Sequence, residues 1–477
     1  MRLRVPAMAL LAILATGVGV NAGTLQPLNH PAPEGIDIAF QLTDGRVLGQ
    51  SAATERHWNL LKPDSHGNYV NGGWTRAADL PSDYGPFAFA SAVLADGRVI
   101  VQGGEYDFGM FTLTNHGEVY DPQRNTWTAL PPPPGWGYIG DSAAAVLPDG
   151  RYVVAEKLDK RMAALDPVSM TWTALATAGK NDFNSEEGLT LLPDGSLLTV
   201  DVKNAPHTER YMVQAGIWSE AGSTPVSLKA PPECCGCARY GGGCYYPPGE
   251  TGPAILRPDG TVFATGGLPQ GETVAHTAIY SPSQNTWKAG PDFPDGDDAG
   301  DNFAVLLPNG NVLVQGSSGY PYEFDGTNLV KQTVCTCGGS LMLLPTGQVL
   351  VGGGAVYASP GVVPAAWRPH ITSFPATVHR GSSYTISGWQ FNGRSQANAF
   401  GDELMTATNY PLVRIINNAT KHVFYARTHD HSTMGVATGK AIVSTHFDVP
   451  ASAETGASTL VVVANGIRSP EVSVTVN

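Results

Sequence analysis

The amino-acid sequence predicts an all-β protein in which a seven-bladed β-propeller is followed by a smaller β-sandwich domain. Three observations lead to this prediction. One hairpin motif recurs seven times, the recurrences have the spacing of propeller blades, and residues 368–477 read as short strands of alternating polarity. We expect the propeller to occupy residues 23–367 and the sandwich to occupy residues 368–477.

Each copy of the hairpin motif is an apolar strand, a two-residue turn ending in glycine, and a second strand. Asp-Gly and Asn-Gly suit a type I′ turn because both central residues need a positive φ. Successive turns lie 52, 53, 45, 65, 50 and 37 residues apart, which is typical of four-stranded blades. The turns are Asp44-Gly45, Asp96-Gly97, Asp149-Gly150, Asp194-Gly195, Asp259-Gly260, Asn309-Gly310 and Thr346-Gly347.

A second signature follows most of the turns. Gly103-Gly104 and Gly266-Gly267 come after the second strand, and a Tyr-Asp-Pro type of turn then leads to a tryptophan four to seven residues later. We expect these tryptophans to lie on outer strands and to pack between blades. They are Trp127, Trp172 and Trp287, with weaker copies at Trp74 and Trp218.

Residues 1–22 have the pattern of an export signal. Arg2 and Arg4 precede an apolar run from Ala7 to Val20, and small residues follow at the expected cleavage site. No second apolar stretch approaches the roughly 18 residues that a membrane span needs. We therefore expect export to a periplasm or to the outside, with no membrane span. The net charge of −13 makes nucleic acid and anionic membranes poor partners.

The glycine pairs and the Tyr-Asp-Pro…Trp signature resemble the kelch repeat. Together with the strands of the tail, such as Leu412-Val-Arg-Ile-Ile and Ser458-Thr-Leu-Val-Val, they resemble the galactose oxidase and glyoxal oxidase architecture. The resemblance implies a kelch-type propeller followed by an immunoglobulin-like (E-set) domain. It also implies a copper-radical site with a Tyr, a Tyr-His pair, a His from the C-terminal domain and a Cys cross-linked to the first Tyr.

The copper-radical residues of the resembled family are not expected in this chain. In that family these residues stand about eight positions before the hairpin turn. The same positions here hold Ala88 in place of the Cys, Asp141 in place of the first Tyr, and Cys337-Gly338 in place of the Tyr-His pair. We therefore predict that the chain does not use copper-radical chemistry.

Carboxylates recur at this position in four consecutive blades. Because innermost strands run parallel around the axis, these side chains should converge on one face, where like charges raise one another's pKa or attract a cation. The alternative is that they are ordinary polar loop residues. We predict catalytic roles for Asp141, Glu186, Glu187 and Asp301, and a ligand-binding role for Glu250.

The resemblance also implies that a loop of the C-terminal domain enters this face. The candidates are His429 and His431 in Thr428-His-Asp-His-Ser. Two imidazoles beside carboxylates could hold one divalent metal (Cu, Zn or Fe, or Ca with the carboxylates), or His431 could act as a general base. The alternative is a surface loop whose histidines cap local turns.

All six cysteines fall in two segments that precede innermost strands. Their even number in an exported protein favours disulfides, with fifteen possible connectivities, and a thiolate metal site is the alternative. Aromatic residues crowd the same loops, and we predict that Trp136, Tyr138, Tyr245 and Tyr246 bind ligand, unless they pack between loops. The cysteines are Cys234, Cys235, Cys237, Cys244, Cys335 and Cys337.

Three functions remain open at this point. The leading hypothesis is that an acidic, aromatic funnel binds a small polar ligand or a saccharide. The second is a metal-dependent oxidoreductase or hydrolase that uses His429 and His431 with funnel carboxylates. The third is a protein-interaction scaffold at the cell envelope, which would have a protein partner and no ligand in the funnel.

Overall fold

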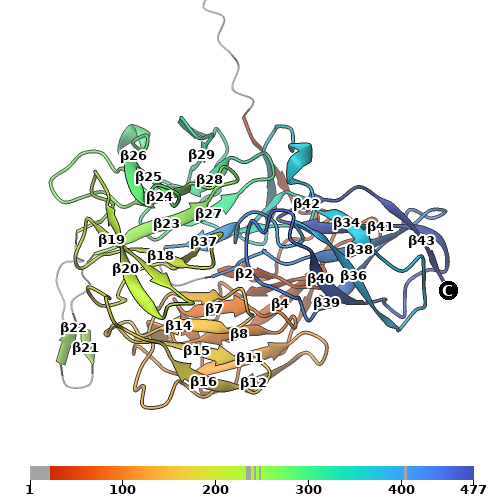
Figure 1. Cartoon of the computed structure of the whole chain (residues 1–477), viewed down its shortest axis with the longest axis horizontal. Coiled ribbons are helices and arrows are strands. Elements are labelled where there is room, and N and C mark those ends of the chain that lie inside the picture. Colours follow the sequence, from red (N-terminus) through yellow and green to blue (C-terminus); the bar gives the residue numbers. More distant parts are fainter. Residues whose placement is uncertain (1–21, 232–237, 241–242, 246–248, 402–404) are drawn as a thin grey trace, which may run out of the picture.

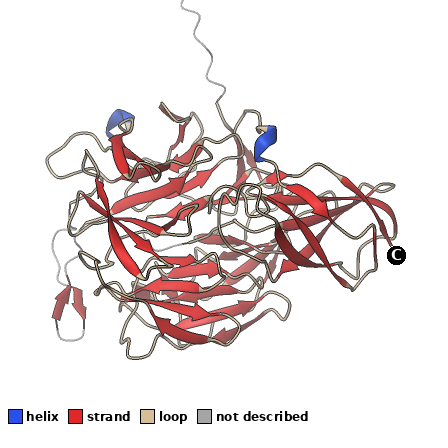
Figure 2. Cartoon of the chain, in the orientation of Figure 1, coloured by secondary structure: helices blue, strands red, loops and turns tan. Residues whose placement is uncertain are grey.

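The computed structural model describes residues 22–231, 238–240, 243–245, 249–401 and 405–477. Figures 1 and 2 show a ring of sheets beside a second group of strands. Two single-turn 3-10 helices, η1 (Pro294–Gly296) and η2 (Ala365–Trp367), are the helices of this described part. No helix in it is long and apolar enough to cross a membrane.

Seven antiparallel blades form the propeller within the described residues, as the seven hairpin turns predict; six are four-stranded sheets, and the sheet of blade six has a fifth strand from the C-terminal domain. From the axis outward, blade one is β2–β5 (Ile38–Gln41, Val47–Gln50, Trp58–Lys62, Gly73–Arg76), and blade two is β7, β8, β11 and β12 (Ala90–Val93, Val99–Gln102, Gly117–Asp121, Thr126–Ala129). Blade three is β13–β16 (Ala144–Val146, Tyr152–Ala155, Met162–Asp166, Thr171–Ala174), and blade four is β17–β20 (Thr190–Leu191, Leu197–Val200, His207–Met212, Ile217–Ser223).

Blades five to seven complete the ring. They are β23–β26 (Thr251–Leu256, Val262–Gly266, Thr277–Ser281, Thr286–Ala289), β27–β30 (Phe303–Leu306, Val312–Gln315, Pro321–Phe324, Leu329–Lys331), and β31–β33 (Leu341–Leu343, Val349–Val351, Ala355–Ala358) with β1 (Thr24–Pro27). Strand β1 supplies the outermost strand of blade seven and so joins the first described residues to the last blade. Loop strands β21 (Ala238–Tyr240) and β22 (Gly243–Tyr245) pair in a separate hairpin.

The tryptophans of the repeat lie between blades, as predicted. The Trp127 ring lies 5.1 Å from that of Trp58 in blade one, and its Nε1 donates to the carbonyl of Ala78 at 2.9 Å. Trp172 in blade three similarly donates to Pro131, which follows blade two. A large ring that is also hydrogen-bonded fixes the rotation of one blade against the next.

The C-terminal strands form an immunoglobulin-like sandwich. Its two halves pack around a shared core that includes Ile386, Val413, Phe447 and Leu460. The strands are β34 (His370–Ser373), β35 (Thr377–Val378), β36 (Ser383–Trp389), β38 (Leu412–Asn417), β39 (Val423–His429), β40 (Val443–Asp448), β41 (Gly456–Ala464), β42 (Ile467–Arg468) and β43 (Val472–Val476).

The sandwich docks on the end of the propeller that carries the hairpin turns, here called the hairpin-turn face. The Thr428 amide donates to Thr43, the Arg427 guanidinium donates to Asp96, and the Met434 amide donates to Pro148, so that the turns of blades one, two and three are all contacted. The opposite end, where the innermost strands begin, is here called the funnel face.

One strand of the C-terminal domain enters the propeller axis. Strand β37 (Asn398–Phe400) pairs antiparallel with β27, the innermost strand of blade six, with Phe400 opposite Phe303. The buried Asn398 accepts from the Leu343 amide of blade seven at 3.0 Å, and Gln396 accepts from the Leu191 amide of blade four at 2.9 Å. The inserted segment thus hydrogen-bonds three blades.

Replacing Asn398 by Leu tests this connection. The change leaves the buried Leu343 amide without its acceptor, which should lower the free energy of unfolding by about 1–3 kcal/mol. Urea denaturation measures the loss. The matched control is Asn418→Leu at an exposed position, where we expect a change within about 0.5 kcal/mol. Equal effects of the two substitutions would contradict the role of Asn398.

Candidate functional site

A cavity of about 360 Å³ opens at the centre of the funnel face. It lies where the innermost strands begin and where the inserted strand β37 ends. Five carboxylates and several aromatic rings line the same space. The lining residues are Asp37, Ile38, Gln50, Phe87, Ala88, Phe89, Glu105, Tyr106, Asp141, Glu250, Asp301, Phe303, Gly338 and Phe400.

Three of the five predicted carboxylates line this cavity. Asp141, Glu250 and Asp301 come from blades three, five and six, and they converge because each stands just before an innermost strand. Asp301 is exposed, and its carboxylate lies so close to Gly401 that a Cβ there would come within 2.6 Å of Oδ1. The parallel arrangement of the innermost strands therefore brings these acids together as expected.

A buried lysine that sequence reasoning missed lies beneath two of the predicted acids. The Lys157 ammonium, fully buried, makes a short ion pair with Asp141 and lies 2.7 Å from Glu186 Oε1. Asp141 is 5% exposed and Glu186 is 2% exposed. Two buried carboxylates this close would repel each other without a cation, so Lys157 allows the acids of blades three and four to lie side by side.

The fifth predicted acid, Glu187, belongs to a second buried cluster in blade four. It lies 2.7 Å from the ammonium of Lys180, which also contacts Asp182 and Glu209. Burial raises the pKa of Glu187 well above its usual value, and Lys180 only partly offsets this. Burial alone would lower the pKa of Lys180, but the surrounding carboxylates outweigh it and raise that pKa. Glu187 is therefore part of the buried interior of blade four.

The backbone turns in the same way where several innermost strands begin. Ala88, Glu186, Asp301 and Cys337 all have left-handed conformations, with φ of 49°, 57°, 49° and 53°. Such a conformation costs a non-glycine residue about 1–2 kcal/mol. These four residues stand eight or nine positions before the hairpin turn of their blade. The constant spacing in the sequence therefore corresponds to a bend of the chain that recurs at the funnel face.

A small three-stranded sheet builds the aromatic wall of the cavity. It consists of β6 (Pro86–Phe87), β9 (Tyr106–Asp107) and β10 (Met110–Phe111). Phe87 and Tyr106 pair directly across it, with ring centroids 6.3 Å apart, and Phe111 packs edge-on against Tyr106 at 5.9 Å. On the other side, Phe303 and Phe400 meet at 4.6 Å.

Trp136 and Tyr138, two of the four predicted ligand-binding aromatics, do not line the cavity. Trp136 is 7% exposed and packs beneath the Arg161 guanidinium at 5.6 Å. Burial and the nearby Glu156 raise the pKa of Tyr138, and Tyr138 does not line the cavity. Tyr246 and the side chain of Tyr245 lie outside the described residues. Trp136 is thus buried against neighbouring side chains, and its role in ligand binding stays a prediction.

Two carboxylates of the cavity escaped the sequence analysis. Asp37 stands seven residues before the first hairpin turn, so the spacing used for blades three to six would have found it in blade one. Burial, with a smaller contribution from Glu55, raises the pKa of Asp37. Glu105 follows the Gly103-Gly104 pair, and its amide donates to Ala88. No simple spacing predicts its position.

His429 and His431 lie at the hairpin-turn face, which differs from the expectation that they enter the funnel. The neighbouring Thr433 hydroxyl donates to the Pro148 carbonyl at 2.9 Å, at the hairpin-turn end of blade three. Asp141 of the funnel precedes the other end of the innermost strand β13. The position of these histidines depends on which surface of the sandwich docks on the propeller, and the spacing of sequence motifs does not predict that surface.

His431 is a buried residue of the interface between the sandwich and the propeller. Its ring stacks parallel to Tyr410, whose hydroxyl donates to the Gln41 carbonyl of blade one. Its Nδ1 contacts the Thr445 hydroxyl at 2.8 Å. Burial lowers the pKa of His431 to about 3, so that the ring is neutral at physiological pH. His431 thus lies in the domain interface and not beside the funnel carboxylates.

Cys335 and Cys337 form a disulfide with each other beside the funnel. The next residue, Gly338, lines the cavity. The structure thus brings one pair of the predicted cysteines to near disulfide distance, within a single local loop. Cys234, Cys235, Cys237 and the side chain of Cys244 lie outside the described residues.

Comparisons with known proteins support a kelch-type propeller. The chain is 32% identical to Kelch-like protein terF of Aspergillus terreus (strain NIH 2624 / FGSC A1156) over 88 residues, which make up 18% of this chain and 18% of that relative. The similarity thus spans less than a fifth of the relative's length. No protein-family model matches the chain.

Two solved structures are similar to this chain. A novel fungal alcohol oxidase of the AA5 family, in complex with copper, superposes with a TM-score of 0.52 at 16% identity, covering 96% of this chain and 100% of that one. Selenomethionine-substituted virginiamycin B lyase from Staphylococcus aureus gives 0.48 at 11% identity, covering 70% and 98%. The alcohol oxidase establishes the shared fold across nearly the whole chain.

Replacing Lys157 by Met tests the buried charge cluster. Removing the ammonium takes its positive charge away from the buried Asp141 and Glu186 carboxylates, which should lower the free energy of unfolding by about 3–5 kcal/mol at neutral pH. Urea denaturation followed by circular dichroism measures the loss. Lys288→Met, at an exposed position of β26, should change stability by less than about 0.5 kcal/mol. A loss no larger than that of the control would refute the role of Lys157.

Proposed function

We propose that the protein is an exported propeller protein whose funnel binds a small polar ligand of the saccharide class. The observation that supports this most directly is that carboxylates and aromatic rings line one cavity. Its volume of about 360 Å³ lies within the range of small-molecule sites. Rings such as Phe87 and Tyr106 can cover the apolar face of a sugar, while Asp141, Glu250 and Asp301 can accept hydrogen bonds from its hydroxyls.

The rigidity of the cavity also supports a binding role. Asp141 is held by the buried Lys157, and the wall that carries Phe87 and Tyr106 is a hydrogen-bonded sheet. Side chains that are already ordered lose little conformational entropy when a ligand arrives, and this increases affinity. Phe87 is 46% exposed and Asp301 is exposed, so that both are accessible to a ligand from solvent.

Thermal-shift screening of neutral mono- and disaccharides, followed by calorimetry on the best binder, tests the proposal. We expect at least one sugar to raise the melting temperature. Asp301→Asn and Phe87→Ala should each raise its Kd at least tenfold, because one removes a hydrogen-bond acceptor and the other a stacking ring. Asn tolerates the left-handed backbone at position 301, so this variant should stay folded.

Matched controls are Asp149→Asn, at a hairpin turn on the opposite face, and Ile217→Ala, an exposed apolar residue of β20. Asn-Gly already occurs at another hairpin turn of the chain, and we expect both controls to bind the sugar as the wild type does. A screen without any binder, or a Kd that the two funnel substitutions leave unchanged, would refute the proposal.

We also propose that the funnel does not carry out copper-radical oxidation. The resemblance implies a Cys, a Tyr and a Tyr-His pair at positions that here hold Ala88, Asp141 and Cys337-Gly338. Among the described lining residues, the polar side chains supply carboxylate, amide and phenol groups, and none supplies an imidazole. This donor set does not fit a copper-radical centre, and we derive no step through one.

Oxygen-consumption measurements test this second part. After incubation with Cu(II) and removal of free metal, the purified protein should consume no oxygen above the blank with primary alcohols, galactose or glyoxal-type aldehydes. Copper-dependent production of hydrogen peroxide from any of these substrates would contradict the proposal.

A further inference from the structure

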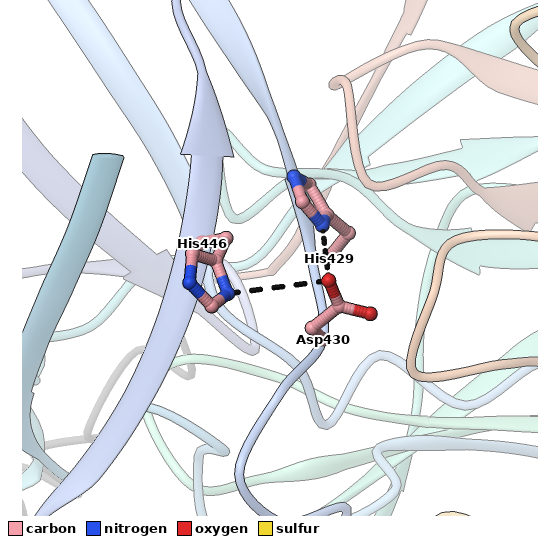
Figure 3. Close-up of side chains that lie close together, drawn as sticks. All are labelled: His429, Asp430 and His446. Carbon is pink, nitrogen blue, oxygen red and sulfur yellow. Dashed lines mark hydrogen bonds and ion pairs between the residues drawn. The ribbon is translucent and has the colours of Figure 1, made fainter. Parts of the chain in front are cut away.

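Two histidines face each other across paired strands of the C-terminal domain. His429 ends β39 and lies directly opposite His446 of β40, and their rings stack with centroids 5.6 Å apart. Asp430 follows His429 with a left-handed backbone, φ 51°, which directs its carboxylate back toward both rings (Figure 3). Asp430 Oδ2 lies 2.7 Å from His429 Nδ1 and 4.0 Å from His446 Nδ1.

A second carboxylate holds the His429 ring in place. His429 Nε2 lies 3.1 Å from Asp448 Oδ1, and the other oxygen of Asp448 accepts from Arg427 at 2.9 Å. A carboxylate on one ring nitrogen fixes the tautomer in which the other nitrogen keeps its lone pair, an arrangement typical of metal-binding histidines. In this tautomer Nδ1, which lies on the side of Asp430, would offer its lone pair to a bound ion.

A cation bound at Nδ1 would satisfy the hydrogen-bonding groups around His429. Both of its ring nitrogens face carboxylate oxygens, and a neutral imidazole can donate to only one of them. His276, between Glu272 and Asp292, faces the same situation. What distinguishes His429 is the second imidazole on the facing strand, because two nitrogens and a carboxylate oxygen lie within 4.8 Å of one another.

We propose that His429, Asp430 and His446 bind a divalent transition-metal ion of the zinc class. Two imidazole nitrogens and a carboxylate form a common zinc ligand set, with bonds of about 2.0–2.2 Å. Tetrahedral coordination at these bond lengths places ligand atoms about 3.4 Å apart, so the 4.0 Å between His446 Nδ1 and Asp430 Oδ2 must shorten when the ion binds. Three protein ligands leave the fourth position for water.

Binding of the ion requires side-chain movements, and the exposed side chains can make them. The 2.7 Å contact between His429 and Asp430 must widen to admit the ion between them. The Asp430 and His446 side chains are 63% and 48% exposed and can rotate, whereas the His429 side chain is 16% exposed and held by Asp448. The site therefore has one ordered ligand and two adaptable ones, and it is independent of the funnel.

The experiment uses the whole mature protein, without a histidine tag, after dialysis against a chelator. Calorimetric titration with Zn²⁺ should show one site, and Co²⁺ should give the visible absorption of a four-coordinate N/O site. His446→Ala and Asp430→Asn should each weaken zinc binding at least tenfold and remove the cobalt absorption. His276→Ala is the matched control and should leave both signals unchanged.

Either of two results would overturn the proposal: no zinc binding by the wild type, or zinc binding that His446→Ala weakens no more than His276→Ala does. The milder His446→Gln, checked by circular dichroism, separates a lost ligand from a lost fold. Because sugar binding and zinc binding are measured separately, and because the funnel variants retain all three metal ligands, failure of one proposal does not affect the other.

Discussion

The pairing of β27 with β37 is the interaction on which the funnel depends. The innermost strands of a propeller present an edge of backbone amides and carbonyls to the axis, and such groups need partners when water is excluded. Strand β37 supplies these partners to blade six. The side chains of Asn398 and Gln396 satisfy amides of blades seven and four in the same way.

This insertion places the end of β37 at the cavity. Phe400, at that end, packs against Phe303, and both line the cavity. The neighbouring Gly401 lets the backbone approach Asp301 closely, where a side chain would clash. The C-terminal domain thus contributes to the site through a strand that crosses the propeller, although the body of that domain lies on the opposite face.

Buried lysines stabilise the buried carboxylates near the funnel face. A cluster of carboxylates in a dry wall would be strongly destabilising, since each charge loses its hydration and repels its neighbours. Lys157 and Lys180 each lie fully buried among two or more acids of blades three and four. Asp301, which also lines the cavity, is instead exposed.

The sequence by itself determined the blades, the parallel innermost strands and the convergence of Asp141, Glu250 and Asp301. These features depend on a turn and a strand close together in the chain, so local patterning encodes them. Only the tertiary structure decided that β1 completes blade seven, that β37 fills the axis, that Lys157 lies beneath two acids, and that His429 pairs with His446 far from the funnel. Each of these contacts joins segments from different strands or domains. Packing and charge decide which surfaces meet there, and motif spacing along the chain does not predict them.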